Sequence, residues 1–372
     1  MSDINDQDLG KKLEQEYAKV KQEIKKPNIL IAGATGVGKS SIINMVFGDN
    51  VAVVGTGKPV TQKIDVYESE DVDVRIFDSK GYEVAADKEF FDSVVNLAAT
   101  TKTPENAIHL IWYCIAAGGG RVTDYDMNAL KSFSSSDIPV AVVLTKVDLA
   151  AEEEIAAMKS VLPASLKESV FLTTTELPEY SQLNKLIAWS ISKLPESLRF
   201  AFIKSQVVDL DAKVKTANLY IIEHCALAFG IGFTPIPVSD APLLIANEMS
   251  LLGRLLYLYD LGSVTSMLGN AGLSSIVGNL LAQGGKAAVG ALIKVLPGGK
   301  LVGGLISGTV GSTITAALGE AASLTSYKIC QARLSGNSAA AEAMIRDFGP
   351  TILEYAKSWI KSGKTVKDIP KE

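Results

Sequence analysis

Residues 33–40, with the sequence GATGVGKS, have the types and spacing that hold a phosphate group. The glycines let successive backbone N–H groups turn toward phosphate oxygens, and a following helix adds partial positive charge at its N-terminus. In this pattern Lys39 reaches the β- and γ-phosphates, and the Ser40 hydroxyl binds Mg²⁺. The residues expected to surround the phosphates are Gly33, Ala34, Thr35, Gly36, Val37, Gly38, Lys39, Ser40 and Ser41.

The base of a nucleotide has a separate candidate site in the sequence TKVD at residues 145–148. The Asp148 carboxylate can accept two hydrogen bonds, from the N1–H and the exocyclic amine of guanine, and adenine cannot supply this pair. The aliphatic stem of Lys146 can cover the face of the base, and Thr145 opens the segment. We therefore expect GTP or GDP as the ligand, with an ATPase as the less favoured alternative.

Two segments between these motifs are candidates for sensing the γ-phosphate. Thr61, with Thr56 as the alternative, lies in a segment expected to be irregular, and its hydroxyl can bind Mg²⁺ while its N–H reaches the phosphate. Asp78 follows the apolar positions of a strand over 72–77 and can bind Mg²⁺ through water. Gly81, three residues later, can donate its N–H to the γ-phosphate.

Two loops carry weaker candidates. Thr173 and Thr174 follow a short strand over 170–172, and a backbone N–H there can contact the guanine oxygen O6. Arg121 follows three glycines after a strand, where a guanidinium could neutralise charge in the transition state. The alternative for Arg121 is an exposed loop arginine without a catalytic role.

The elements around these motifs are those that the chemistry requires. An apolar strand over 28–32 precedes the glycine-rich turn, and a helix over 41–47 follows it. A buried strand over 138–144 delivers Thr145 and the TKVD segment. Strand, turn and helix in this order favour a phosphate-binding loop over a glycine-rich loop without a ligand.

Four motifs in order, GATGVGKSS, PVT, DSKGY and TKVD, resemble those of P-loop GTPases. The resemblance extends over residues 27–195 and is greatest to the Era/TrmE/septin-like branch, which includes immunity-related and chloroplast-import-type GTPases. It implies an α/β domain with a doubly wound, mostly parallel sheet that binds the nucleotide at the strands' carboxyl ends. It further implies Mg²⁺-dependent hydrolysis of GTP to GDP and phosphate, and a homodimer across the nucleotide faces.

Two positions depart from patterns in this superfamily. Tyr82 stands where small Ras-like members carry a catalytic glutamine directly after the DxxG motif. Because a phenol cannot orient the attacking water as an amide does, we expect a low intrinsic rate. Gly36 stands where potassium-dependent members carry asparagine, so a potassium-activated mechanism is not expected.

The composition of the chain bounds its class. A length of 372 residues with 47% hydrophobic residues is enough for about two ordered domains. A net charge of −5 and the lack of a basic module argue against nucleic acid as a partner. Three cysteines without CxxC spacing, Cys114, Cys225 and Cys330, predict neither a disulfide framework nor a zinc site. With no signal peptide recognisable in the charged first 26 residues, we expect a cytoplasmic protein.

The chain divides into three parts by pattern. Residues 1–26 carry an amphipathic helix that either packs on the chain's own second domain or contacts a partner or membrane. Residues 27–195 form the GTP-binding domain. Residues 196–372 are expected to be all helical and resemble a helical domain of unknown function found after Era-like GTPase domains. Its expected helices span 198–230, 243–259, 263–283, 287–296, 301–334 and 338–362, with a proline-rich elbow over 234–242.

The uncharged run 301–319 allows two interpretations. It is just long enough to span a bilayer, but its serines, threonines and glycines equally suit a tightly packed helical bundle. We favour a soluble bundle that contacts a membrane surface reversibly. The leading functional hypothesis is a GTPase switch that repositions this helical domain. The alternative is a homo-oligomeric scaffold or membrane-remodelling GTPase assembled by nucleotide.

Overall fold

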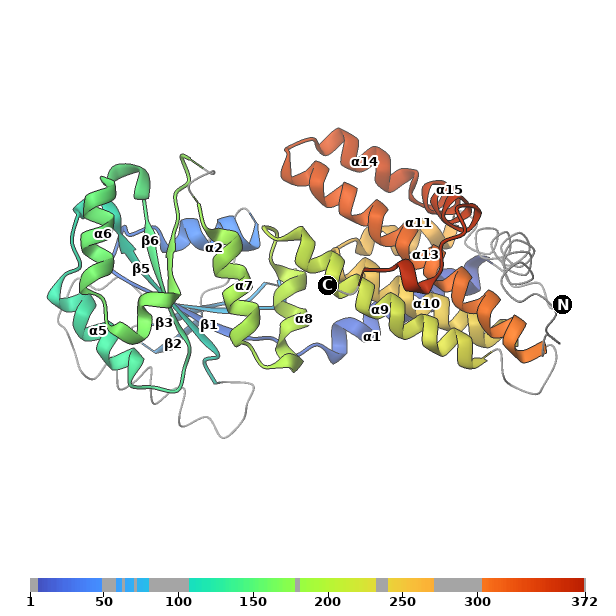
Figure 1. Cartoon of the computed structure of the whole chain (residues 1–372), viewed down its shortest axis with the longest axis horizontal. Coiled ribbons are helices and arrows are strands. Elements are labelled where there is room, and N and C mark those ends of the chain that lie inside the picture. The colour runs from blue at the N-terminus through green and yellow to red at the C-terminus, as the bar shows by residue number, and fades with distance from the viewer. Residues whose placement is uncertain are drawn as a thin grey trace. The chain divides into compact units, whose positions relative to one another are not determined.

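The computed structural model describes residues 6–48, 58–61, 64–69, 72–79, 107–177, 181–231, 240–270 and 303–370 (Figure 1). The chain folds as two compact units. The first unit comprises Ile24–Asp209, and the second comprises Met1–Glu23 together with Leu210–Glu372. The second unit is therefore built from both ends of the chain, and every candidate nucleotide-binding residue belongs to the first.

Within the described residues, the first unit holds one seven-stranded sheet in the order β2-β3-β4-β1-β5-β6-β7. The strands are β1 (Asn28–Ala32), β2 (Lys58–Thr61), β3 (Ile64–Tyr67), β4 (Arg75–Ser79), β5 (Leu110–Ala116), β6 (Val140–Thr145) and β7 (Val170–Leu172). β4, β1, β5, β6 and β7 run parallel, whereas β3 is antiparallel to β2 and β4. The mostly parallel sheet predicted from the sequence is confirmed.

Helices cover both faces of this sheet, on opposite sides of the strands in Figure 1. One face buries Phe133 of α5 (Asp124–Ser134) and Met158 of α6 (Glu152–Val161). The other face buries apolar residues of three helices, α2 (Lys39–Phe47), α7 (Leu183–Lys193) and α8 (Glu196–Ser205). Because both faces are covered, the central strands are continuous buried runs rather than alternating ones.

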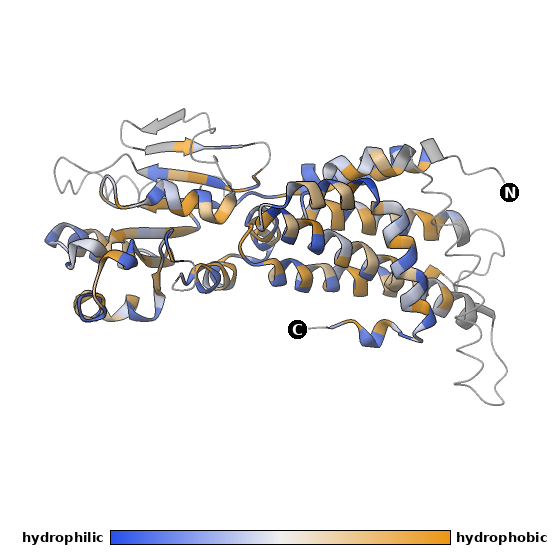
Figure 2. Ribbon diagram, turned by 90° about the horizontal axis from the view of Figure 1, so that it is seen from above, coloured by the Kyte–Doolittle hydropathy of each residue, from blue (hydrophilic) through white to orange (hydrophobic). Residues whose placement is uncertain are grey.

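The second unit is helical throughout its described residues, and its helices carry hydrophobic and hydrophilic residues intermixed along their length (Figure 2). Its helices are α1 (Asp6–Glu23), α9 (Leu210–Ile231), α10 (Asp240–Leu258), α11 (Gly262–Asn270), α13 (Gly303–Leu334), α14 (Ser338–Arg346) and α15 (Phe348–Lys361). None of the described helices is both long and apolar enough to cross a membrane.

The N-terminal amphipathic helix α1 packs against α10 and α11 of its own chain. Its apolar side chains Leu9 and Leu13 are fully buried, and the Tyr17 ring meets the edge of Tyr257 at 5.1 Å. A Cβ atom at Gly253 would lie 3.1 Å from the backbone nitrogen of Tyr17, so the glycine permits close contact between the helices. Of the two alternatives for this helix, packing on the second domain is the one observed.

Two of the predicted helices are each divided in the structure, and several other expectations lie outside the described residues. The helix predicted over 198–230 is two helices, α8 and α9, because buried Gln206 organises a turn over 206–209. α8 packs on the sheet, so the first unit extends to Asp209 rather than to residue 195. The helix predicted over 338–362 is α14 and α15, divided at Asp347, with Pro350 in the first turn where a missing N–H costs little. The helix predicted over 287–296, most of the one over 263–283 and most of the elbow lie outside the described residues.

Candidate nucleotide-binding site

The glycine-rich loop between β1 and α2 has a backbone that favours glycine at three positions. Gly33, Gly36 and Gly38 have φ angles of +140°, +76° and +99°. A Cβ atom at Gly33 would lie 2.3 Å from the Cys114 carbonyl oxygen, closer than any real contact. Nothing lies within 4 Å of a Cβ atom at Gly36, so that residue borders open space. The loop is thus pressed against β5 on one side and open on the other.

Lys39 begins α2, and its side chain is held in this loop. It is 8% exposed, and its Nζ donates to the carbonyl oxygens of Gly33 at 3.0 Å and Ala34 at 3.1 Å. Carbonyl dipoles orient the ammonium group without carrying a full negative charge. A buried cation held in this way, beside backbone N–H groups and the N-terminus of α2, suits an anionic ligand such as a phosphate. The residues of the loop therefore fit the phosphates of a nucleotide.

The TKVD segment is tied directly to this loop. The Thr145 hydroxyl is buried and donates to the Val37 carbonyl oxygen, across 108 residues of sequence. The Nζ of Lys146 donates to the Gly36 carbonyl oxygen at 2.7 Å, and Lys146 itself adopts a left-handed φ of +52°. A left-handed conformation is unfavourable for a residue with a side chain, and such outliers cluster at ligand sites. The two predicted motifs are brought together at the carboxyl ends of β1 and β6.

Asp148 lies half-buried in the short helix η3 (Val147–Leu149) and is fixed by the loop after β7. The Thr174 hydroxyl donates to its Oδ1 at 2.5 Å and accepts from the Glu176 N–H at 3.1 Å. Thr173 is used internally, because its N–H donates to the Leu144 carbonyl oxygen at 2.8 Å. The Thr173 N–H is therefore engaged within the protein, and the contacts of Thr173 and Thr174 with the base oxygen stay predictions.

The candidate metal-binding residues lie at the same edge of the sheet. Asp78 is next to the end of β4 and pairs in register with Ile31 of β1, just before the glycine-rich loop. Thr61 ends β2 and pairs with Ile64, which in turn pairs with Ser79. Thr61 thus lies in a strand, not in the irregular segment that was expected, because the hairpin with β3 continues the sheet. Thr56, Gly81 and Tyr82 lie outside the described residues.

Cys114 of β5 is a residue of the site that the sequence did not single out. Its carbonyl oxygen is the atom that excludes a side chain at Gly33. Burial raises the pKa of its thiol to about 12, Lys39 acts to lower that pKa and Asp78 acts to raise it. The thiol is therefore uncharged at neutral pH, and the backbone of Cys114 forms the wall behind the loop. The glycine at position 33 indicates from sequence that some backbone approaches the loop closely. It does not indicate which residue supplies that backbone.

Arg121 is exposed and lies in the loop after β5, beyond the short helix η2 (Ala117–Gly119) and Gly120. This loop leaves the carboxyl end of the sheet, the edge that carries the glycine-rich loop. Its proposed contact with a nucleotide stays a prediction.

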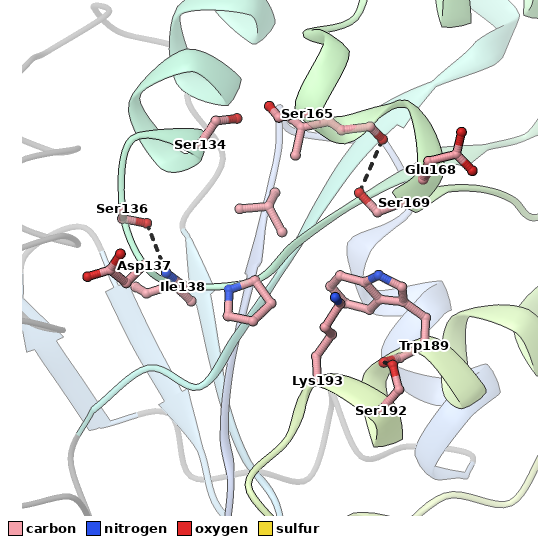
Figure 3. A pocket seen from close by; sticks show the side chains of 13 residues that line it. Ser134, Ser136, Asp137, Ile138, Ser165, Glu168, Ser169, Trp189, Ser192 and Lys193 are labelled. Atoms are coloured by element: carbon pink, nitrogen blue, oxygen red, sulfur yellow. Dashed lines mark hydrogen bonds between the residues drawn. The ribbon is translucent and has the colours of Figure 1, made fainter.

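A second cavity, of about 490 Å³, opens at the opposite end of the sheet, beside the start of β6 (Figure 3). Asp137, Glu168, Trp189 and Lys193 line it together with several serines. Four of the serine hydroxyls donate to nearby carbonyl oxygens three or four residues earlier in the chain, for example Ser192 to Trp189 at 2.7 Å. None of the predicted nucleotide-binding residues lines this cavity, which is therefore separate from the candidate site.

The sequence of the first unit is similar to those of known GTPases. Residues 28–146 match the family of 50S ribosome-binding GTPases. The chain is 28% identical over 134 residues to a probable GTP-binding protein EngB of Wolbachia pipientis wMel, covering 36% of this chain and 68% of that protein.

Two solved structures are similar at a TM-score of 0.32. One is the bacterial selenocysteine-specific elongation factor EF-Sec, 18% identical, with 47% of this chain and 29% of that chain covered. The other is a GDP-bound mutant of the S. thermophilus FeoB G-domain, 15% identical, with 68% and 94% covered. The family match includes the glycine-rich loop, Asp78 and the start of the TKVD segment. Residues 28–146 of this chain therefore form a P-loop GTPase domain, of a family that binds GTP and GDP with Mg²⁺.

Proposed function

We propose that this protein is a Mg²⁺-dependent GTPase of the Era/TrmE/septin-like branch that hydrolyses GTP slowly and acts as a switch. The strongest support is the convergence at one sheet edge of a phosphate loop, a buried lysine and the TKVD segment. Lys146 donates to Gly36 and Thr145 donates to Val37, so the parts that would hold the base and the phosphates are joined by hydrogen bonds. A single ligand with a base at one end and phosphates at the other fits such an arrangement.

The chain's residues would divide the work of hydrolysis as follows. Lys39 and the backbone N–H groups of residues 33–41 would bind the β- and γ-phosphates and stabilise charge on the transferring group. Ser40 and Thr61 would hold Mg²⁺, with Asp78 contacting it through water. When bound, this ion neutralises charge shared between the β- and γ-phosphates. The Gly81 N–H would contact the γ-phosphate, and Arg121 would neutralise transition-state charge.

The slow rate follows from the residue after the DxxG motif. Tyr82 offers one hydroxyl, whereas a glutamine side chain both donates and accepts and can hold water in line for attack. Turnover of GTP by the full-length protein, measured as phosphate release with Mg²⁺ and with EDTA, tests both the slow rate and the requirement for Mg²⁺. We expect turnover only with Mg²⁺ and well below a typical enzyme rate of about 10 per second. Turnover that is equally fast in EDTA would contradict the proposed role of the ion.

Guanine specificity is tested by displacement of a fluorescent GDP analogue. GDP and GTP are expected to displace it at least 100-fold more effectively than ATP, because adenine leaves the Asp148 carboxylate without its two donors. Equal displacement by ATP would favour the ATPase alternative.

Two further parts of the proposal concern partners. Nucleotide-dependent homodimerisation across the nucleotide faces would complete a site that lacks the glutamine. It predicts an increase in mass by light scattering with a non-hydrolysable GTP analogue but not with GDP. The same mass in both states would contradict it.

The helical unit would contact a membrane surface from the cytoplasm. The end of α9 exposes Leu227 and Phe229, 52% and 38% accessible, and the start of α10 exposes Leu243, 49% accessible. Gly311 of α13 lies close to Ala228 and Leu244, so the neighbours of these residues share one end of the bundle. Flotation with anionic vesicles should retain the full-length protein and lose it when Leu227 and Phe229 are changed to glutamate. Equal flotation of the variant would contradict this contact.

A further inference from the structure

The chain passes between its two units twice, after Glu23 and after Asp209. We call residues 24–27, which lead into β1, the first passage, and residues 206–209, which follow α8, the second passage. The two passages and the end of α8 form ion pairs and hydrogen bonds with one small part of the first unit. This part consists of Asp73 and Arg75, at the start of β4, and Val46, at the end of α2. These contacts suggest how the nucleotide state could reach the helical unit, an inference that rests on the proposed GTPase function.

Asp73, two residues before β4, forms ion pairs with the first passage and with the end of α8. Its carboxylate is 1% exposed, with Lys26 Nζ at 3.5 Å from Oδ1 and Lys204 Nζ at 3.4 Å from Oδ2. Lys26 belongs to the first passage, and Lys204 belongs to the last turn of α8. Separating this buried carboxylate from one lysine would remove part of the compensation of its charge, so these contacts resist breaking.

Backbone hydrogen bonds fasten the same segments. The N–H of Asp73 donates to the Ser205 hydroxyl at 2.8 Å, and the N–H of Arg75 donates to the Pro27 carbonyl oxygen at 2.9 Å. The N–H of Val207 donates to the carbonyl oxygen of Val46, in the last turn of α2, at 2.9 Å. The end of α8 is therefore bonded to the start of β4, and the second passage is bonded to α2.

The turn that precedes α9 is held by hydrogen bonds of one buried side chain. Gln206 is fully buried, its Nε2 donates to the Asp209 carbonyl oxygen at 2.7 Å, and its Oε1 accepts from the Asp209 N–H at 2.7 Å. Residues 206–209 therefore form a hydrogen-bonded turn directly before the first residue of α9.

Aromatic packing couples α8 to the same helix. Phe202 of α8 meets Phe47 of α2 edge to face at 6.1 Å, and Phe47 stacks on Trp112 of β5 at 6.1 Å. These rings therefore join α8 to the end of α2 and to β5 by close packing.

α2 and β4 each connect the candidate site with these contacts. α2 begins at Lys39 and Ser40 and ends beside Val46, over nine residues. β4 spans five residues, with Asp78 next to its last residue and Asp73 two residues before its first. We infer that residues 204–207, bonded to α2 through Val46 and to β4 through Asp73, form the joint that transmits the nucleotide state to α9. Val207 and Ser205 are positioning residues that lie at the far end of these elements from the nucleotide.

Hydrogen–deuterium exchange of the full-length protein, with GDP and with a non-hydrolysable GTP analogue, tests this inference. We expect exchange over residues 208–215 to differ between the two nucleotides in the wild type. Val207→Pro removes the N–H that reaches Val46, and this difference should fall by at least half. Gln206 has φ −77° and ψ +148°, which is the conformation that a following proline favours, so the change adds no strain there.

Val207→Ala is the matched control, because it keeps the N–H and should keep the difference. Ser205→Ala removes the acceptor of the Asp73 N–H without changing charge, and serves if the proline variant does not fold. Affinity for the fluorescent GDP analogue should stay within threefold in all three variants. A wild type that binds the analogue but shows no difference over 208–215 would overturn the joint, as would a full difference in Ser205→Ala and Val207→Pro. Failure to bind the analogue at all would instead overturn the proposed GTPase function.

Discussion

The Thr174 hydroxyl donates a hydrogen bond to the Asp148 carboxylate at 2.5 Å, which joins the loop after β7 to the TKVD segment after β6. Asp148 also precedes Leu149, whose N–H donates to the Lys146 carbonyl oxygen at 3.1 Å. The carboxylate is thus oriented before any base binds, and less conformational freedom is lost on binding. Substitution of Asp148 alone should therefore change nucleotide affinity measurably.

Asp148→Asn should lower the affinity for GDP by about 100-fold or more, because two charge-assisted hydrogen bonds to the base are lost. An asparagine amide can instead donate to the C2 carbonyl of xanthine, so binding of xanthosine diphosphate should increase. Competition against a fluorescent GDP analogue measures both. Asp137→Asn, at the opposite end of the sheet, is the control and should bind GDP normally. An Asp148→Asn protein with unchanged preference for guanine would remove Asp148 from the base site.

Gly33→Ala should destabilise the first unit by about 3 kcal/mol, because a Cβ atom meets the Cys114 carbonyl at a left-handed φ. Gly36→Ala should cost only about 1 kcal/mol, since the strain of φ +76° remains but nothing obstructs the methyl group. Urea unfolding followed by tryptophan fluorescence compares the two. Equal losses of stability would mean that the close contact with β5 does not set the requirement for glycine.

Lys39→Met should lower nucleotide affinity by about 100-fold or more, since the ammonium group would make charge-assisted bonds to the phosphates. Without nucleotide, the melting temperature of the variant should equal or exceed that of the wild type, because a buried charge that carbonyl oxygens hold among the described residues has been removed. Thermal unfolding with and without GDP separates these effects. Lys193→Met, in the distant cavity, should leave both measurements unchanged. A Lys39→Met protein stabilised by GDP as fully as the wild type would contradict the phosphate contact.

The helical unit should lose stability as the pH rises, because of Glu248. Burial raises the pKa of this carboxyl to about 8, although the Thr315 hydroxyl donates to Oε1 at 2.6 Å and acts to lower it. The folded state therefore keeps a proton that the unfolded state releases above its ordinary pKa of about 4.3. The free energy of unfolding should fall between about pH 4.5 and 8, by a few kcal/mol in order of magnitude.

Glu248→Gln should flatten this dependence, since an amide of the same shape does not titrate. Unfolding of both proteins in urea at pH 5.5 and pH 8, followed by circular dichroism, gives the comparison. A wild type whose helical unit is more stable at pH 8 than at pH 5.5 would show that Glu248 is not held protonated.

Much of the first unit could be predicted from the sequence, because its signals are local. Eight residues with glycines at 33, 36 and 38 specify the phosphate loop, since each needs a positive φ within a single turn. Continuous apolar runs such as Leu110–Ala116 predict buried parallel strands. Asp148 could be named as the candidate for base recognition because a carboxylate matches the two donors of guanine.

Only the tertiary structure decided which distant segments share an environment. The order of residues does not show that Thr173 spends its N–H on Leu144, or that Cys114 is the wall behind Gly33. Helical periodicity identified α1 but not its partners α10 and α11, because an apolar face does not specify which surface buries it. The break at Gln206 and the bond from Val207 to Val46 were also hidden, since both depend on contacts between residues far apart in the chain. The sequence thus determined the chemistry of each loop, and packing determined how the loops and the two passages of the chain are joined.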